Sequence, residues 1–165
     1  MNKMQLPKIK LGNKDVSRLI LGGNTISGFS HISDAVSLEM VKYYTMENCQ
    51  KLLNECLANG ISTVQFRGDR FFLRMLLEHY EKGCKIQFIG QTASEVKDVR
   101  ANIKEIMKYK PIAIYHHGTE VDNMYHAGKM NEIHDIIKFI KDCGVPAGLG
   151  SHIPEVIAQA EEKQW

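Results

Sequence analysis

The feature of this sequence that most constrains its fold is a regular alternation of short apolar segments with longer amphipathic ones. Each short segment is followed by apolar residues at helical spacing, which predicts a strand and then a helix. Alternation of this kind is typical of a parallel sheet covered by helices. We count five such strand–helix units in the 165 residues.

A closed (β/α)8 barrel needs about 250 residues, so five units amount to a part of one. We therefore predict an α/β fold of the (β/α)8 TIM-barrel type, truncated to about five units. It forms one partial domain over residues 1–165, with strands six to eight missing. A short N-terminal hairpin, turning at Gly12–Asp15, is expected to close the bottom of the barrel.

The expected elements follow from the apolar runs and from the capping residues. Strands are predicted over Arg18–Gly23, Ser62–Arg67, Lys85–Gly90, Ile112–His116 and Val145–Gly150. Helices are predicted from Thr45 to Gly60, over Phe71–Lys82, Ser94–Tyr109 and Met130–Cys143, and from Pro154 to a point beyond Trp165. A weak capping box of Ser94 and Lys97 would begin the third of these helices. The stretch 24–44 is expected to be a long irregular loop.

Composition excludes several classes of partner and compartment. The net charge is +2 and the charges are mixed, so nothing points to a nucleic acid. No apolar run reaches the roughly 18 residues of a membrane span, and Met1–Lys10 has no signal-peptide core. The four cysteines are scattered and form no CxxC pair, which favours a reducing cytoplasm.

In a parallel barrel the active site lies at the carboxyl ends of the strands. The residues at these positions are polar and include groups that transfer protons, bind anions or hold metals. They are Asn24 and Thr25, Arg67 and Asp69, Gln91 and Thr92, Tyr115, His116, His117 and Gly118, and Ser151 and His152. The sequence thus predicts an enzyme scaffold that binds a small-molecule substrate.

Each of these candidates has a structural alternative. His116 and His117 are adjacent and point to opposite sides of the strand, so at most one faces the barrel mouth. Arg67 and Asp69 would alternatively form a structural ion pair with each other. His152 would alternatively cap the last helix. Asp122 would either hold a histidine tautomer or be an ordinary turn residue.

Several segments, in order along the chain, resemble the aldo-keto reductases. They are Lys10–Gly12, Val16–Leu19 and Leu21–Gly23 at the start, Gly60–Val64, Ile114–His117, and Gly148–His152 with Pro154 and Glu155. The resemblance implies a TIM barrel, NADP as cofactor, and reduction of a carbonyl by a catalytic set of aspartate, tyrosine, lysine and histidine.

This sequence departs from that catalytic set. Gln65 stands where the resemblance places the aspartate, and Gln91 where it places the lysine. No tyrosine occurs in 68–72, and only the histidine has a counterpart, His117. His152 replaces the asparagine that follows the serine on the fifth strand. The chain therefore resembles a divergent branch, in which Asn24, Thr25, Gln65, His116, Ser151 and His152 would contact substrate or cofactor.

Three hypotheses follow for function. The first is an aldo-keto-reductase-like oxidoreductase in which His117 polarises a small carbonyl or alcohol substrate. Arg67 or Asp69 would then replace the lost acid, Gln91 would complete the catalytic set, and the loop 24–44 would close over the substrate.

The second is a metal-dependent hydrolase, lyase or isomerase with a divalent ion on His117, His152 and Asp69. The third is an inactive fragment of a larger barrel enzyme that self-associates through its open edges.

Overall fold

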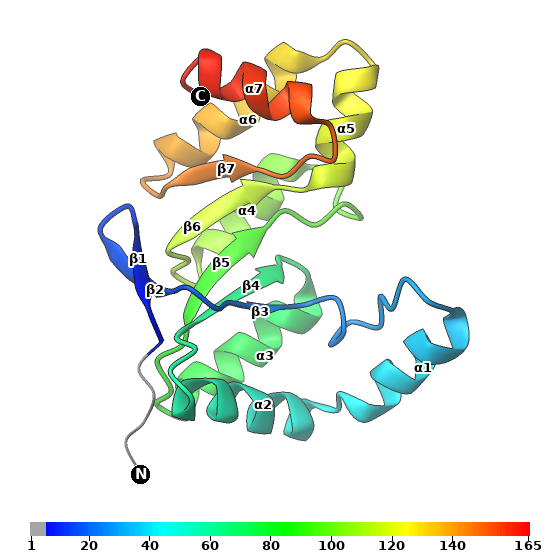
Figure 1. Ribbon diagram of the computed structural model, residues 1–165, viewed down its shortest axis with the longest axis vertical. Helices are drawn as coiled ribbons and strands as arrows, with labels where there is room; N and C mark the ends of the chain where they lie inside the picture. The colour runs from blue at the N-terminus through cyan, green and yellow to red at the C-terminus, as the bar shows by residue number, and fades with distance from the viewer. Residues whose placement is uncertain (1–5) are drawn as a thin grey trace. The chain divides into compact units, whose positions relative to one another are not determined.

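The computed structural model describes residues 6–165 (Figure 1). Five strands make one parallel sheet flanked by helices. In spatial order they are β3 (Leu21–Gly22), β4 (Thr63–Arg67), β5 (Gln87–Gln91), β6 (Ala113–His116) and β7 (Ala147–Leu149). The sheet confirms the α/β class and the parallel order of the strands, while barrel closure stays a prediction.

An antiparallel hairpin precedes the sheet, as predicted. Its strands are β1 (Lys8–Leu11) and β2 (Lys14–Ser17), and Gly12 takes a φ of 57° in the turn between them. A φ in this region is open to glycine at no steric cost. The helices are α1 (Asp34–Tyr43), α2 (Met46–Ala58), α3 (Arg70–Glu81), α4 (Val99–Met107), α5 (Gly118–His126), α6 (Met130–Asp142) and α7 (Pro154–Glu162).

The chain divides into two compact units. The first runs up to Phe66 and resumes over Arg70–Phe88, and the second joins Arg67–Asp69 to Ile89–Trp165. Both units therefore take in residues from strands β4 and β5, and each is described below by itself.

In the first unit, β3 pairs with β4 and α2 packs against α3. The predicted cap of α2 is confirmed, because Thr45 Oγ1 accepts a hydrogen bond from the Asn48 amide. The buried side chains Cys49, Leu53 and Cys56 recur at helical spacing and form the inner face of this helix. The helix is followed by Gly60.

A buried polar contact joins α2 to α3. His79 is fully buried, and its Nδ1 lies 2.8 Å from Oε1 of Gln50, whose amide donates to the carbonyl oxygen of Met75. Because the Gln50 oxygen accepts, His79 carries its proton on Nδ1. Its Nε2 is buried without a partner, and burial lowers the pKa of His79. This imidazole is therefore held neutral in the folded chain.

In the second unit, α6 supplies the main apolar face. It packs against β6 and β7 and also contacts α4 and α5. Its buried side chains are Ile133, Ile136, Ile137 and Ile140. This spacing is that of one helical stripe, as the sequence indicates for this segment.

The stretch 24–44 is not the irregular loop that we expected, because it contains α1. Ser33 caps this helix by accepting a hydrogen bond from the Val36 amide, and Asp34 lies in the first turn. None of its residues is buried. The helix was missed because it has no buried stripe to give a helical period, although Ser33 and Asp34 are start signals.

Two further expectations about helices are wrong, and one helix was not predicted. Asp98, and not Ser94, caps α4, because residues 93–96 form a turn closed by the Val96 amide on the Ala93 carbonyl. Residues 118–126 form α5, which buries only Val121 and so shows little periodicity. The last helix begins at Pro154, as predicted, but ends at Glu162, before Trp165.

The remaining sequence expectations concern membranes and thiols. Over residues 6–165 no helix combines the length and apolar character that crossing a bilayer requires. All four cysteines are free thiols, and burial raises the pKa of Cys49 and Cys56.

Gly68, at the end of β4, generates a stability prediction. A Cβ at this position would overlap Cδ1 and Cγ1 of Ile106, which is fully buried. Gly68→Ala should therefore lower the free energy of unfolding by about 1–3 kcal/mol in a denaturant titration.

The matched control is Gly22→Ala, since a Cβ there meets no atom within 4 Å. It should change stability by no more than about 0.5 kcal/mol. Equal effects of the two substitutions would contradict the close packing at Gly68.

Candidate functional site

Most of the predicted strand-end residues lie in the second unit. Arg67 ends β4 and Asp69 follows it, His116 ends β6 and His117 follows it, and Ser151 and His152 follow β7. The structure brings them together in three groups, each built by short polar contacts. Asn24, Thr25 and Gln65 belong to the first unit, where Asn24 Nδ2 lies 3.4 Å from Nε2 of His31.

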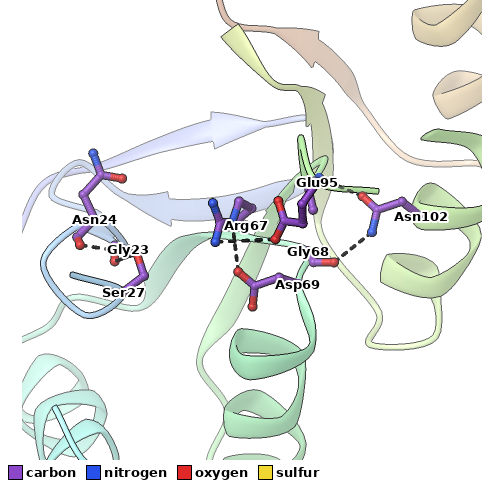
Figure 2. Close-up of polar contacts among 9 residues, drawn as sticks. Gly23, Asn24, Ser27, Arg67, Gly68, Asp69, Glu95 and Asn102 are labelled. Carbon is purple, nitrogen blue, oxygen red and sulfur yellow. Dashed lines mark hydrogen bonds and ion pairs between the residues drawn. The ribbon is translucent and has the colours of Figure 1, made fainter. Parts of the chain in front are cut away.

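The first group is an ion-paired cluster around Arg67 (Figure 2). Arg67 Nε donates to Asp69 Oδ2 at 2.9 Å, and its Nη2 lies 3.5 Å from Oε1 of Glu95. The Arg67 and Asp69 side chains are largely buried, whereas that of Glu95 is half exposed. The predicted structural alternative, an Arg67–Asp69 pair, is thus present. Glu95 was not predicted, because it lies beyond the strand end in a turn.

Asn102 of α4 fixes the loops that carry this cluster. Its Oδ1 accepts from the Ala93 amide and its Nδ2 donates to the Gly68 carbonyl, each at 2.8 Å (Figure 2). The Gly68 amide in turn donates to the Gln91 carbonyl at 2.7 Å. Asn102 was missed, although a buried polar residue beside Ile103 on an apolar helix face is a usable signal.

The second group centres on the hydroxyl of Thr92. Thr92 Oγ1 accepts from the His117 amide at 3.0 Å and lies 2.8 Å from Nδ1 of His116. His116 is buried, and its Nε2 has no hydrogen-bond partner. Burial, aided by the nearby His117, lowers the pKa of His116 to about 4. His116 is therefore the packed member of the pair, and its hydrogen-bond partner is the Thr92 hydroxyl.

His117 is the member of the pair with electrostatic neighbours. Burial is the main cause that lowers its pKa. Glu120 and Glu95 raise it, while Arg67 and His152 lower it. Its Nδ1 is buried without a partner, and the residue stands at the N-cap position of α5. Gln91, expected to act with His117, contributes its carbonyl oxygen to the Gly68 amide.

The third group joins α5 to the segment after β7. Asp122 Oδ2 lies 2.6 Å from Nδ1 of His152, and Asp122 Oδ1 accepts from Ser151 Oγ at 2.6 Å. The His152 amide also donates to this carboxylate. Asp122 thus holds a histidine, as one of its two sequence alternatives stated. Hydrogen bonds from Ser151 and His152 hold the pKa of Asp122 below its ordinary value against its partial desolvation.

The alternative in which His152 caps the last helix is wrong. Ile153 occupies the N-cap position of α7 without a side-chain cap bond. Instead, Ser151 Oγ accepts from the Ile153 amide at 3.0 Å. His152 is left with its side chain 79% exposed and its ring tied to Asp122.

A metal site on His117, His152 and Asp69 stays a prediction. Within the described chain, from residue 6 onward, no three His, Cys, Asp or Glu side chains are grouped so that they would hold a metal ion. The contacts of two of these residues are made to other partners, since Asp69 pairs with Arg67 and His152 with Asp122.

The buried His116 predicts an acid-sensitive fold. Its pKa is about 4 in the folded chain and about 6.5 when unfolded, so the unfolded chain takes up the proton first as the pH falls. The free energy of unfolding should therefore decrease between pH 6.5 and 4, by at most about 1.4 kcal/mol per pH unit for this one group.

His116→Asn should flatten this part of the pH–stability curve, as followed by urea unfolding at a series of pH values. His126→Asn, at an exposed histidine, is the matched control and should leave the curve unchanged. An unchanged slope in His116→Asn would show that the acid sensitivity lies elsewhere.

Comparison of the chain with protein-family models, with curated proteins and with solved structures gives no match in any of the three. The resemblance to the aldo-keto reductases therefore rests on the sequence segments alone.

Proposed function

We propose that this chain carries part of the active site of an aldo-keto-reductase-like barrel oxidoreductase that acts on a small carbonyl or alcohol. The observation that carries the proposal is the environment of His117, a strand-end histidine with a buried, unpartnered Nδ1 among charged neighbours. Closure of the strands into a TIM barrel and a cytoplasmic location are parts of the same proposal.

The protonation of His117 suits a group that polarises a carbonyl. Its lowered pKa favours the neutral imidazole at pH 7. A buried nitrogen without an acceptor is better unprotonated, since an unpaired N–H would cost the full desolvation of a donor. This favours the tautomer with the proton on Nε2. A neutral imidazole of that tautomer can donate a hydrogen bond from Nε2 to a substrate oxygen.

The ion-paired cluster around Arg67 contributes to the electrostatic environment of His117. The Arg67 guanidinium lies close enough to His117 to oppose its protonation. The ion pair with Arg67 gives the Asp69 carboxylate a structural partner, which makes Asp69 a poor choice for the lost acid. Arg67 is better assigned to opposing the protonation of His117, and its ion pair with Asp69 to fixing the loop.

The cofactor NADP is implied by the resemblance alone, and the residues that we can test do not fit it. Ser151 would be the contact to the nicotinamide carboxamide, but its hydroxyl already donates to Asp122 and accepts from the Ile153 amide. Arg67 is ion-paired with two carboxylates, those of Asp69 and Glu95. The dinucleotide would have to be held by other residues, and we derive no step through it.

The proposal predicts reduction of small aldehydes or ketones that depends on His117. With a panel of such substrates and NADPH, His117→Gln should lower kcat by about 100-fold, because it removes the group that polarises the carbonyl. The consumption of NADPH is followed by its absorbance.

His126→Gln, at an exposed position on α5, is the matched control and should keep the wild-type rate. No turnover by the wild type, together with no change in nicotinamide fluorescence at millimolar cofactor, would contradict the proposed function.

A further inference from the structure

The carboxylate of Asp122 is held in one place by groups from the segment after β7. It accepts from the Ser151 hydroxyl, from the His152 amide and from Nδ1 of His152, with the shortest contacts at 2.6 Å. These donors favour its ionised form, in agreement with its lowered pKa. Since a carboxylate without a proton only accepts, the proton of this contact lies on Nδ1 of His152.

The arrangement is not a Ser–His–Asp nucleophile triad. In such a triad the serine hydroxyl is bonded to the histidine nitrogen that lies opposite the aspartate. Here the Ser151 hydroxyl donates to the same carboxylate as the histidine and accepts from the Ile153 amide. Ser151 therefore positions Asp122 and is not placed to be activated by His152.

The remaining nitrogen of His152 is available for chemistry. With Nδ1 protonated, Nε2 of the neutral ring carries the lone pair, and the side chain is 79% exposed. The ring lies beside Gly118, since a Cβ there would come 3.6 Å from Cε1 of His152, an ordinary van der Waals distance. Gly118 directly follows His117, and the charge of His152 is felt at His117. The two imidazoles thus belong to the same site.

We propose that Asp122 and His152 form a proton-transfer dyad at the end of β7, in which His152 Nε2 exchanges a proton with the substrate oxygen and Asp122 is the positioning residue. The identity of that oxygen, a carbonyl that becomes an alcohol, rests on the proposed function. The dyad supplies the acid that the sequence lacks, since neither Gln65 nor Gln91 can donate a proton in that role.

The proton transfer is a simple exchange. In the acid direction, the Nε2–H bond of the protonated ring breaks and its electron pair stays on Nε2. A new O–H bond forms from a lone pair of the substrate oxygen. In the reverse direction, Nε2 takes the proton of the alcohol. Asp122 stays ionised throughout and stabilises the imidazolium through Nδ1–H.

Several charged or titratable groups lie near His152. Asp122 of α5 is its direct partner, and His117, at the N-cap of the same helix, lies close enough for the charge of His152 to lower its pKa. Glu120, which acts on His117, is the next charge on that helix.

The tautomer of His152 tests the dyad without any substrate. Nitrogen-15 NMR of the full chain at alkaline pH should show Nδ1 protonated in the wild type. Asp122→Ala should transfer the proton to Nε2. Ser151→Ala leaves the Asp122–His152 contact in place and should keep the wild-type tautomer, as should the control Asp135→Ala on α6. A wild type with the proton on Nε2, or no change in Asp122→Ala, would overturn the dyad.

Turnover tests the role of the dyad in the reaction. His152→Gln leaves Asp122 bonded to Ser151, so the segment after β7 stays anchored. It should lower kcat by about 100-fold with little change in KM, and added imidazole should restore part of the rate. A wild-type kcat in His152→Gln, with kcat lost in His117→Gln, would overturn the dyad and leave the proposed function standing.

Failure of the proposed function can also be distinguished from failure of the dyad. If the wild type reduces no carbonyl substrate, the proposed function fails, and the tautomer of His152 still decides whether the dyad exists.

Discussion

The shape of the candidate site depends on one buried amide, that of Asn102. It satisfies a carbonyl and an amide that belong to two separate strand-end loops, at Gly68 and Ala93. These loops carry Arg67 and Asp69 on one side and Glu95 on the other. Without the amide, two backbone groups in this buried region would lose their partners, at a cost of about 1–3 kcal/mol each. The hydrogen bonds of Asn102 thus help to place the side chains that form the ion pairs around Arg67.

Burial sets the charge of several histidines in this chain. His79, His116 and His117 each have a lowered pKa, with burial as the main cause, and each leaves one ring nitrogen buried without a partner. His152 differs, since its ring is exposed and tied to a carboxylate. A buried imidazole and an exposed imidazole bonded to a carboxylate therefore occur at His117 and His152, and the proposed acid–base chemistry on a substrate oxygen needs such a division of roles.

The elements that could be predicted are those with a buried stripe or an unambiguous cap. The strands, the Thr45 cap of α2 and the Pro154 start of α7 follow from such local signals. Helices α1 and α5 could not be recognised, because they bury one residue or none and so lack a period. The start of α4 was also misplaced, because Ser94 and Asp98 are both possible N-cap residues and the structure uses Asp98.

The candidate site shows the same division. The search for polar residues at the carboxyl ends of the strands placed Arg67 near Asp69 and His116 near His117. Both pairs are close in the structure because their members are close in the sequence. The search could not assign Asn102 to Gly68, or choose His152 as the partner of Asp122. These pairs are separated by 34 and 30 residues, and nothing local specifies them.

Helix α1 has a consequence for how this chain would behave in a cell. It buries no residue, and Leu38, Val41 and Tyr43 are each more than half exposed. A helix of 10 residues is marginal without tertiary packing, so its free energy of local opening is small. Its amide hydrogens would exchange with solvent before those of the sheet, and a protease would find its first cleavage site there. Proteolysis would then begin at this helix, while the buried face of α6 is still protected.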